Sequence, residues 1–184
     1  MTARGTNLPR VKKQNEALIK EIIYKYGPIS RSKIAEMLSL TPPTITTNVT
    51  SLIERGLVYE FPADASDVEE RSLGRRPVKI DFVQDARYAI GVELNPYQTA
   101  ICMLDLHGNE KISVKYPPMN GEYVEEMDAL AQSIDKLIAG SGVDMEKILG
   151  VGVGLPGFVE AKAGVLRESF KTNWNNKNIA RDLT

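Results

Sequence analysis

The sequence has few of the residues that build covalent or metal-bound frameworks. Among 184 residues there is one cysteine, Cys102, and one histidine, His107. A single cysteine excludes an internal disulfide, and one cysteine with one histidine leaves no Cys/His cluster for a structural zinc site. These counts are typical of a protein of a reducing compartment that folds by burying apolar side chains.

Long hydrophobic runs are absent as well. No segment approaches the roughly 20 apolar residues of a membrane span, and the first ten residues, MTARGTNLPR, lack the apolar core of a signal peptide. We therefore expect a cytoplasmic protein with no membrane partner. The composition, 42% hydrophobic and 26% charged, is ordinary for a soluble protein of one or two domains.

Charged residues are missing from one segment, residues 37–53 (MLSLTPPTITTNVTSLI). It carries Thr44, Thr46, Thr47 and Thr50 in what otherwise reads as a helix, although β-branched residues are mediocre helix formers and a solvated helix face usually carries Glu and Lys. Hydroxyl and methyl groups of threonine suit base edges in the major groove of DNA. We therefore predict that this segment faces DNA.

The net charge of −1 is unevenly distributed. Residues 1–80 hold 13 Lys and Arg against 9 Asp and Glu, and residues 81–184 hold 10 against 15. The basic front half is what a module that meets phosphates requires, although chance clustering also explains such a count.

Three helices are predicted in the first 55 residues. The first, residues 15–26, has the apolar stripe Leu18, Ile19, Ile22, Ile23 and Tyr26. Ser30 is predicted to cap a helix over 31–38, and Thr41 a third helix that starts at Pro42. The third helix is predicted to bury Ile45, Val49, Leu52 and Ile53.

This order predicts a helix-turn-helix whose second helix enters the major groove. The residues predicted to reach bases are Thr44, Thr46, Thr47, Asn48 and Ser51. Those predicted to contact phosphate, near the helix ends, are Arg31, Ser32, Lys33 and Thr41.

A wing is predicted after these helices. Residues 57–60 and 78–82 read as two strands joined by a polar loop, which closes a first domain at residue 82. In that loop Arg75 and Arg76 precede Pro77, and by analogy with arginine arms they are predicted to enter the minor groove. A solvated linker is the alternative.

The second domain, residues 83–184, is predicted to be an α/β layer. Strands are expected at residues 88–94, 98–106, 111–116 and 148–153, a helix at 122–139, and a hairpin at 158–166. Gly150 and Gly152 alternate along a strand, which leaves one face bare for sheet packing or for a ligand.

Segments across nearly the whole chain resemble the ROK family of bacterial repressors and sugar kinases, in particular its xylose-repressor-like regulators. The matching segments are residues 29–58, 74–77, 88–92, 105–108, 150–157 and 173–174. The resemblance implies a fold that is α/β, or α+β overall: a winged helix-turn-helix followed by the first lobe of an actin-like, ribonuclease-H-like domain.

The resemblance also implies a function. A member of this kind represses carbohydrate genes by binding double-stranded operator DNA and releases it when a sugar occupies the second domain. The positions that match this lobe's side of the sugar pocket are Gly154, Pro156, Gly157 and Asn173.

Two departures from the family pattern shape the expectation. Kinase members carry an Asp-x-Gly-Gly-Thr phosphate loop, whereas residues 93–97 read ELNPY, so we expect no enzyme activity. Members continue for about as long again beyond residue 184, into the zinc motif and most of the dimer interface. We therefore expect a truncated chain without a cofactor, and a homodimer only for a longer form.

Two alternatives stay open. A sugar kinase of the same fold would be favoured by intact phosphate-loop glycines. A winged helix that binds protein would be favoured by a salt-insensitive partner and no DNA binding.

Overall fold

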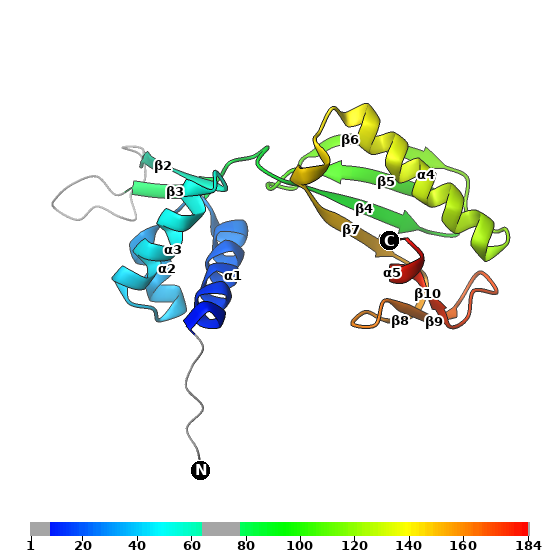
Figure 1. Cartoon of the computed structure of the whole chain (residues 1–184), viewed down its shortest axis with the longest axis horizontal. Coiled ribbons are helices and arrows are strands. Elements are labelled where there is room, and N and C mark those ends of the chain that lie inside the picture. Colours follow the sequence, from blue (N-terminus) through cyan, green and yellow to red (C-terminus); the bar gives the residue numbers. More distant parts are fainter. Residues whose placement is uncertain (1–7, 64–77, 184) are drawn as a thin grey trace, which may run out of the picture. The chain divides into compact units, whose positions relative to one another are not determined.

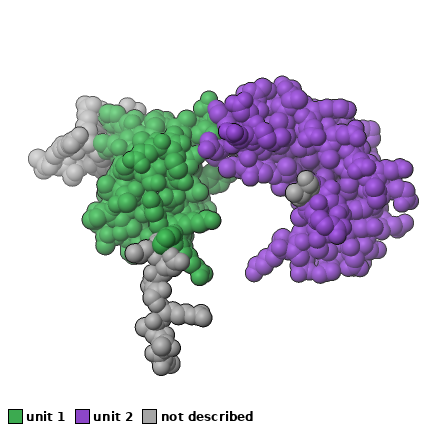
Figure 2. Space-filling model, in the orientation of Figure 1, with its two compact units in different colours: residues 1–86 green, residues 87–184 purple. Residues whose placement is uncertain are grey.

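The chain forms two compact units, residues 1–86 and 87–184 (Figures 1 and 2). The computed structural model describes residues 8–63 and 78–183. Each unit buries its own set of apolar side chains. In the part of the chain described, no helix has the length and apolar character needed to cross a membrane.

The first unit is built on three helices, α1 (Leu8–Tyr26), α2 (Arg31–Leu38) and α3 (Pro42–Glu54). Helix α1 begins seven residues before the predicted start. Its stripe is narrower than predicted, because Ile19 and Ile23 are buried whereas Leu18 and Tyr26 are exposed. The buried part of α1 is therefore formed by Ile19 and Ile23 rather than by the whole predicted stripe.

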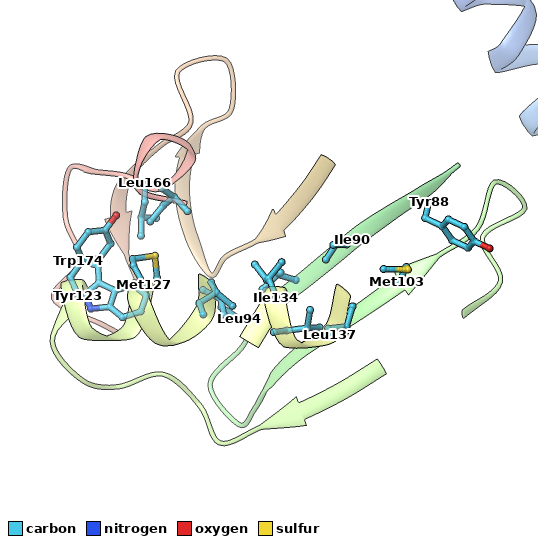
Figure 3. Close-up of a cluster of buried hydrophobic side chains, with 14 residues drawn as sticks. Tyr88, Ile90, Leu94, Met103, Tyr123, Met127, Ile134, Leu137, Leu166 and Trp174 are labelled. Carbon is cyan, nitrogen blue, oxygen red and sulfur yellow. The ribbon is translucent and has the colours of Figure 1, made fainter. Parts of the chain in front are cut away.

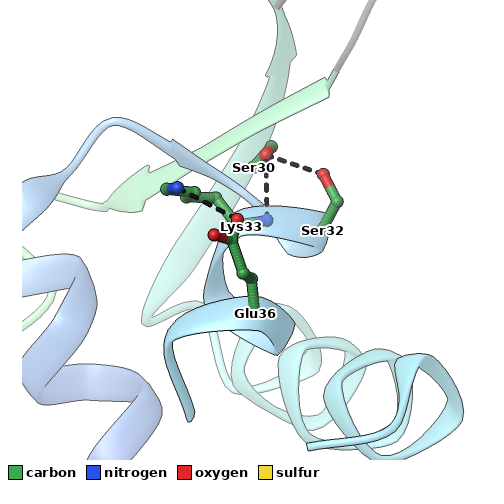
Figure 4. Close-up of polar contacts among 4 residues, drawn as sticks. All are labelled: Ser30, Ser32, Lys33 and Glu36. Atoms are coloured by element: carbon green, nitrogen blue, oxygen red, sulfur yellow. Dashed lines mark hydrogen bonds and ion pairs between the residues drawn. The ribbon is translucent and has the colours of Figure 1, made fainter. Parts of the chain in front are cut away.

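Local sequence signals set where α2 and α3 begin. Ser30 adopts the extended N-cap conformation, and its hydroxyl accepts a hydrogen bond from the Lys33 amide at 3.3 Å (Figure 4). Pro42 occupies the first turn of α3 as predicted, where its missing N–H costs nothing. The prediction for Thr41 is only half right. It takes the N-cap conformation, but its side chain caps no backbone amide.

A small antiparallel sheet completes the first unit. Strands β2 (Val58–Pro62) and β3 (Val78–Phe82) form the predicted wing pair, with Glu60 opposite Ile80. A short strand that the sequence did not reveal, β1 (Ile29–Ser30), pairs with the other edge of β3. The fully buried Ile80 of this sheet belongs to the unit's core with Ile45 and Leu52 of α3.

The second unit contains a four-stranded mixed sheet in the order β6-β5-β4-β7. Strands β4 (Tyr88–Leu94), β5 (Thr99–Leu104) and β6 (Glu110–Tyr116) form the predicted antiparallel meander, and β7 (Ile148–Gly154) pairs with β4 in parallel. Because β4 and β7 run in the same direction, their carboxyl ends meet at one edge of the sheet.

Helix α4 (Tyr123–Ser141) covers one face of this sheet (Figures 1 and 3). Alternate residues of β4 are buried beneath it, as a half-covered strand requires. Figure 3 shows Ile134 of the helix close to Leu94 and Ile90 of the strand, and Met127 beside Tyr123 and Trp174 in the same cluster. Cys102, predicted as a core residue, is instead half-buried, opposite Gly91 across the strand pair.

A hairpin and a short helix extend the second unit beyond β7. Strands β8 (Gly157–Glu160) and β9 (Val165–Ser169) form the predicted hairpin. Strand β10 (Lys177–Asn178) and helix α5 (Ile179–Asp182), absent from the prediction, return the chain to the core, where Ile179 and Trp174 are buried. Winged helix and mixed α/β lobe together confirm the predicted fold class.

Candidate nucleic-acid interface and ligand site

Helix α3 exposes a row of uncharged side chains. Pro43, Thr46, Thr47 and Thr50 are all exposed, and a spacing of three, four and seven residues places them on one helical face. No charged residue occurs in α3 before Glu54. Thr46 and Thr47, two of the residues predicted to reach bases, therefore lie on an exposed surface, and the base contact itself stays a prediction.

Asn48 does not lie on that face, which corrects the prediction that it contacts a base. It is 3% exposed, and its amide nitrogen donates to the Thr44 carbonyl oxygen at 2.7 Å. Its buried Oδ1 has no partner among the described residues. Asn48 lies on the buried side of α3, whereas Ile53, predicted to be buried, is only partly covered. The exposed face is therefore rotated around the helix from its predicted position and includes Thr46 and Thr50.

The exposed face also includes Thr50, which is not among the residues predicted to reach bases. Thr50 is one of the four threonines of the uncharged segment. The prediction takes Ile53 as part of the buried face, and this puts the opposite, exposed face at Asn48 and Ser51 instead of at Thr50. The available signal was its spacing from Thr46 and Thr47, four and three residues earlier.

Ser51 faces helix α1 rather than the open face, so the structure does not support it as a base contact. Its hydroxyl is 3.4 Å from Glu16 Oε1. Glu16 also accepts from Arg55 at 2.6 Å, and Arg55 Nε donates to the Ser51 carbonyl oxygen. This cluster joins the end of α3 to α1.

Arg31, predicted to contact phosphate, instead joins three elements of the unit. Its Nε donates to Glu60 of β2 at 2.6 Å, and its Nη1 donates to the carbonyl oxygen of Thr46 at 3.2 Å. About a quarter of its side chain is exposed, 27%, so the pair is partly shielded from solvent. Arg31 therefore positions α3 against the wing and has its charge already matched.

The other predicted phosphate contacts lie on the surface. Lys33 is exposed and pairs with Glu36 at 2.9 Å on the same helix (Figure 4). The exposed Ser32 shares a hydrogen bond with Ser30, and the hydroxyls of Thr41 and Thr44 share another, with Thr44 half-buried. Arg75 and Arg76 lie outside the residues that the structure describes.

In the second unit a small cavity of about 20 Å³ opens at the carboxyl ends of β4 and β7. Its polar lining comes from three loops, through Asn95, Asn120, Ser169, Lys171 and Thr172. Ligands of α/β proteins usually bind outside the carboxyl ends of parallel strands. Among the described residues, a larger hollow of about 620 Å³ is lined by apolar side chains and glycine, so its side chains offer a sugar no hydrogen bond.

The loop after β4 uses its amides internally. The Asn95 side-chain oxygen accepts from the backbone N–H groups of Tyr97 and Gln98, each at 2.9 Å. In a phosphate-binding loop such amides point at the ligand. Here the Asn95 side chain takes that place, so these two amides do not point at a ligand.

The four predicted sugar residues are not equally placed. Pro156 lines the cavity, whereas Gly154, Gly157 and Asn173 do not. Gly157 has a packing reason to be glycine, because a Cβ there would overlap the carbonyl oxygen of Glu168. At Gly154 a Cβ would stand at an ordinary 3.7 Å from the Val92 oxygen. Asn173 is exposed in the loop before Trp174.

A cluster of ionisable side chains joins helix α5 to the start of helix α4. The Tyr123 hydroxyl donates to Asp182 at 2.6 Å, and its ring meets Trp174, a cavity-lining residue, edge to face at 5.5 Å. Burial, and then the hydrogen bond to Asp182, raises the pKa of Tyr123 well above its usual range. Hydrogen bonds from Arg181 and Tyr123 lower the pKa of Asp182.

Known proteins match both units. The MarR family matches residues 14–65, which cover most of α1, helices α2 and α3, and strands β1 and β2. The DNA-binding transcriptional dual regulator NagC of Escherichia coli K12 is 32% identical over 158 residues, covering 86% of this chain and 38% of NagC. The xylose repressor of Bacillus spizizenii is 28% identical over 169 residues, covering 92% of this chain and 42% of that protein.

A solved structure gives the same result for the fold. The crystal structure of a ROK family transcriptional regulator, a homologue of the E. coli MLC protein, matches with a TM-score of 0.73 at 20% identity, over 94% of this chain and 43% of that one. The chain thus spans about two fifths of the length of these relatives. By sequence and by fold, the chain belongs to the ROK family, among the relatives of the N-acetylglucosamine and xylose repressors.

Proposed function

We propose that this chain is a transcriptional regulator that binds operator DNA through α3 and the wing and represses carbohydrate genes. The single observation that carries the proposal is the exposed, uncharged threonine face of α3, set in a capped helix-turn-helix beside a two-stranded wing. Its curated relatives, the N-acetylglucosamine and xylose repressors, support the same assignment. DNA binding is assigned to residues 1–82 and sensing to residues 83–184.

The effector in this proposal is a sugar or sugar derivative, bound at the carboxyl ends of β4 and β7. The cavity there is too small to enclose a hexose, so the sugar would lie across its mouth, next to Pro156 and Lys171. Gly154 ends β7, Gly157 begins β8, and Asn173 precedes the cavity-lining Trp174 in the sequence. We keep these three residues as proposed sugar contacts.

We also propose that the chain regulates without catalysing phosphoryl transfer. The turn at Asn95 supports this, because its amide donors are already bonded to the asparagine side chain and a proline follows. Formation of ADP and a sugar phosphate when the purified chain is incubated with ATP, Mg²⁺ and a sugar would contradict it.

Fluorescence anisotropy tests the proposed function. The 184-residue chain is titrated into labelled DNA from upstream of its own gene, with an unrelated duplex as control, across a salt series. We expect tighter binding to the upstream DNA and a fall in affinity with salt. Equal binding to both duplexes would refute a regulator of that gene.

The sensing part needs a separate readout. Xylose, glucose and N-acetylglucosamine are added to the protein–DNA complex and, separately, to the free protein in a thermal-shift assay. A sugar that raises the melting temperature and releases DNA supports the sensing site. DNA binding that no sugar affects, with no thermal shift, would confine this chain's function to DNA binding.

A further inference from the structure

The exposed face of α3 offers DNA only methyl, methylene and hydroxyl groups. Its members are Pro43, Thr46, Thr47 and Thr50. None of the three threonine hydroxyls is hydrogen-bonded to a residue that the structure describes, so they remain available to a partner. A threonine methyl packs against the C5 methyl of thymine, the one apolar group that a base pair presents in the major groove.

The side chains that would read other bases are withdrawn from this face. Guanine is read mainly by arginine or lysine and adenine by asparagine or glutamine. Asn48, the helix's one amide, is buried with its nitrogen on the Thr44 carbonyl oxygen. Arg31 is bonded to Glu60 and Arg55 to Glu16, each at 2.6 Å. Lys33 of α2 is exposed and pairs only with Glu36, but within the described residues the exposed face of α3 itself presents no bidentate reader to a guanine or an adenine.

We infer that α3 recognises its half-site through the methyl groups of a short run of thymines, contacted by Thr46, Thr47 and Thr50. The inference rests on the proposed DNA-binding function and adds the base class that the site reads. Burying one methyl group against another changes binding about fourfold. Two or three such contacts account for roughly 16- to 64-fold discrimination between thymine and a base that lacks the methyl.

The test removes the methyl from the DNA and then from the protein. Sequences that the 184-residue chain retains from a random duplex pool are determined, and each thymine of the best one is replaced singly by deoxyuridine, which lacks only the C5 methyl. We expect about fourfold weaker binding at two or three adjacent positions and no change elsewhere.

Thr50→Ser then removes the protein's methyl and keeps its hydroxyl. This variant is expected to bind the unmodified duplex about fourfold more weakly and to become indifferent to deoxyuridine at one position. Val124→Ala removes exposed methyl groups from helix α4 of the second unit, away from the proposed sugar cavity, and is the control that keeps the wild-type response. The deoxyuridine series needs no variant, so a folding defect in Thr50→Ser would not spoil the test.

The outcomes separate the two proposals. Sequence-selective binding with no response to any deoxyuridine, or a selected half-site built of G·C pairs, overturns the thymine readout and leaves the DNA-binding function standing. Failure to retain any preferred sequence overturns both.

Discussion

At the scale of single residues, charge pairing decides which basic side chains are available to DNA. Arg31 and Arg55 are each bonded to a glutamate on another element, and both also hold a backbone carbonyl of α3. Lys33 pairs only with Glu36 of its own helix, at the surface. An exposed pair of that kind contributes little and is readily exchanged for a phosphate.

The two kinds of cation should respond differently to mutation. We expect Arg31→Gln to lower the free energy of unfolding by about 1 kcal/mol and to weaken DNA binding with little change in its salt dependence, because Arg31 holds α3 in place. Lys33→Gln should leave stability unchanged and reduce the slope of log affinity against log salt by about 1. Urea unfolding and anisotropy at several salt concentrations measure both. A slope change in Arg31→Gln alone would make Arg31 the phosphate contact.

Substitution by alanine should affect Gly154 and Gly157, two of the proposed sugar contacts, differently. Gly157→Ala is expected to destabilise the chain by about 1 to 3 kcal/mol, because the new methyl overlaps the Glu168 carbonyl oxygen. Gly154→Ala should fold normally, since its Cβ meets only an ordinary contact. A loss of sugar-induced thermal shift in Gly154→Ala, with unchanged unfolding, would place Gly154 at the effector. An unstable Gly154→Ala would contradict the geometry.

At the scale of elements, the two helices of the DNA-binding motif begin in different ways. Helix α2 relies on the Ser30 hydroxyl, which accepts from the Lys33 amide, whereas α3 relies on proline in its first turn. Both starts come from local sequence, but only the first depends on a side-chain cap.

Removing each cap residue tests that difference. Ser30→Ala should cost about 1 kcal/mol of stability, the usual value for a lost N-cap. Thr41→Ala should cost only a few tenths, because Thr41 caps no amide and shares just one exposed hydroxyl contact with Thr44. Chemical denaturation followed by circular dichroism measures both. Equal losses would mean that Thr41 caps α3 in solution.

Helix α5 is fastened to α4 by the bond between Tyr123 and Asp182. Because Arg181 and Tyr123 lower the pKa of Asp182, its contribution to stability is present above the ordinary carboxyl pKa and is lost as the pH falls through the lowered value. Tyr123→Phe should therefore cost about 1 kcal/mol at pH 7, and the difference from wild type should shrink as the pH falls below the ordinary carboxyl pKa. Urea unfolding across a series of pH values measures it. A difference that does not vary with pH would show that lost packing, not the carboxylate bond, is responsible.

At the scale of the whole molecule, the described residues include one helix, α3, for which we propose a place in the major groove. Operators of helix-turn-helix dimers carry two half-sites about one helical turn apart, and simultaneous binding to both raises affinity by roughly 10²–10⁴. Two copies of this chain joined by a flexible linker should therefore bind a palindromic duplex at least about 100-fold more tightly than one copy. The control joins one intact copy to a copy carrying Thr46→Asp and Thr50→Asp. No gain over this control would mean that the two half-sites are not occupied together.

Much of the fold follows from local sequence. The strand at Tyr88–Leu94, the start of α3 at Pro42 and the Ser30 cap are all set by neighbours in the chain, through period-two alternation, a fixed φ and a hydroxyl within reach of an amide. Helix α5 and strands β1 and β10 escaped prediction because two to four residues carry no periodicity of their own. They exist because a distant strand or core supplies their partners.

The candidate DNA site divides in the same way. The uncharged, threonine-rich character of α3 was determined by the sequence alone, because it is a property of composition that no packing can change. Which threonines face outward was decided by the tertiary structure. Asn48 is buried, and with Asn48 on the inner side Thr50 lies at the surface. Arg31 is paired with Glu60, 29 residues away, and Arg55 with Glu16, 39 residues away. Such pairings depend on contacts between elements, which the order of residues along one helix does not contain.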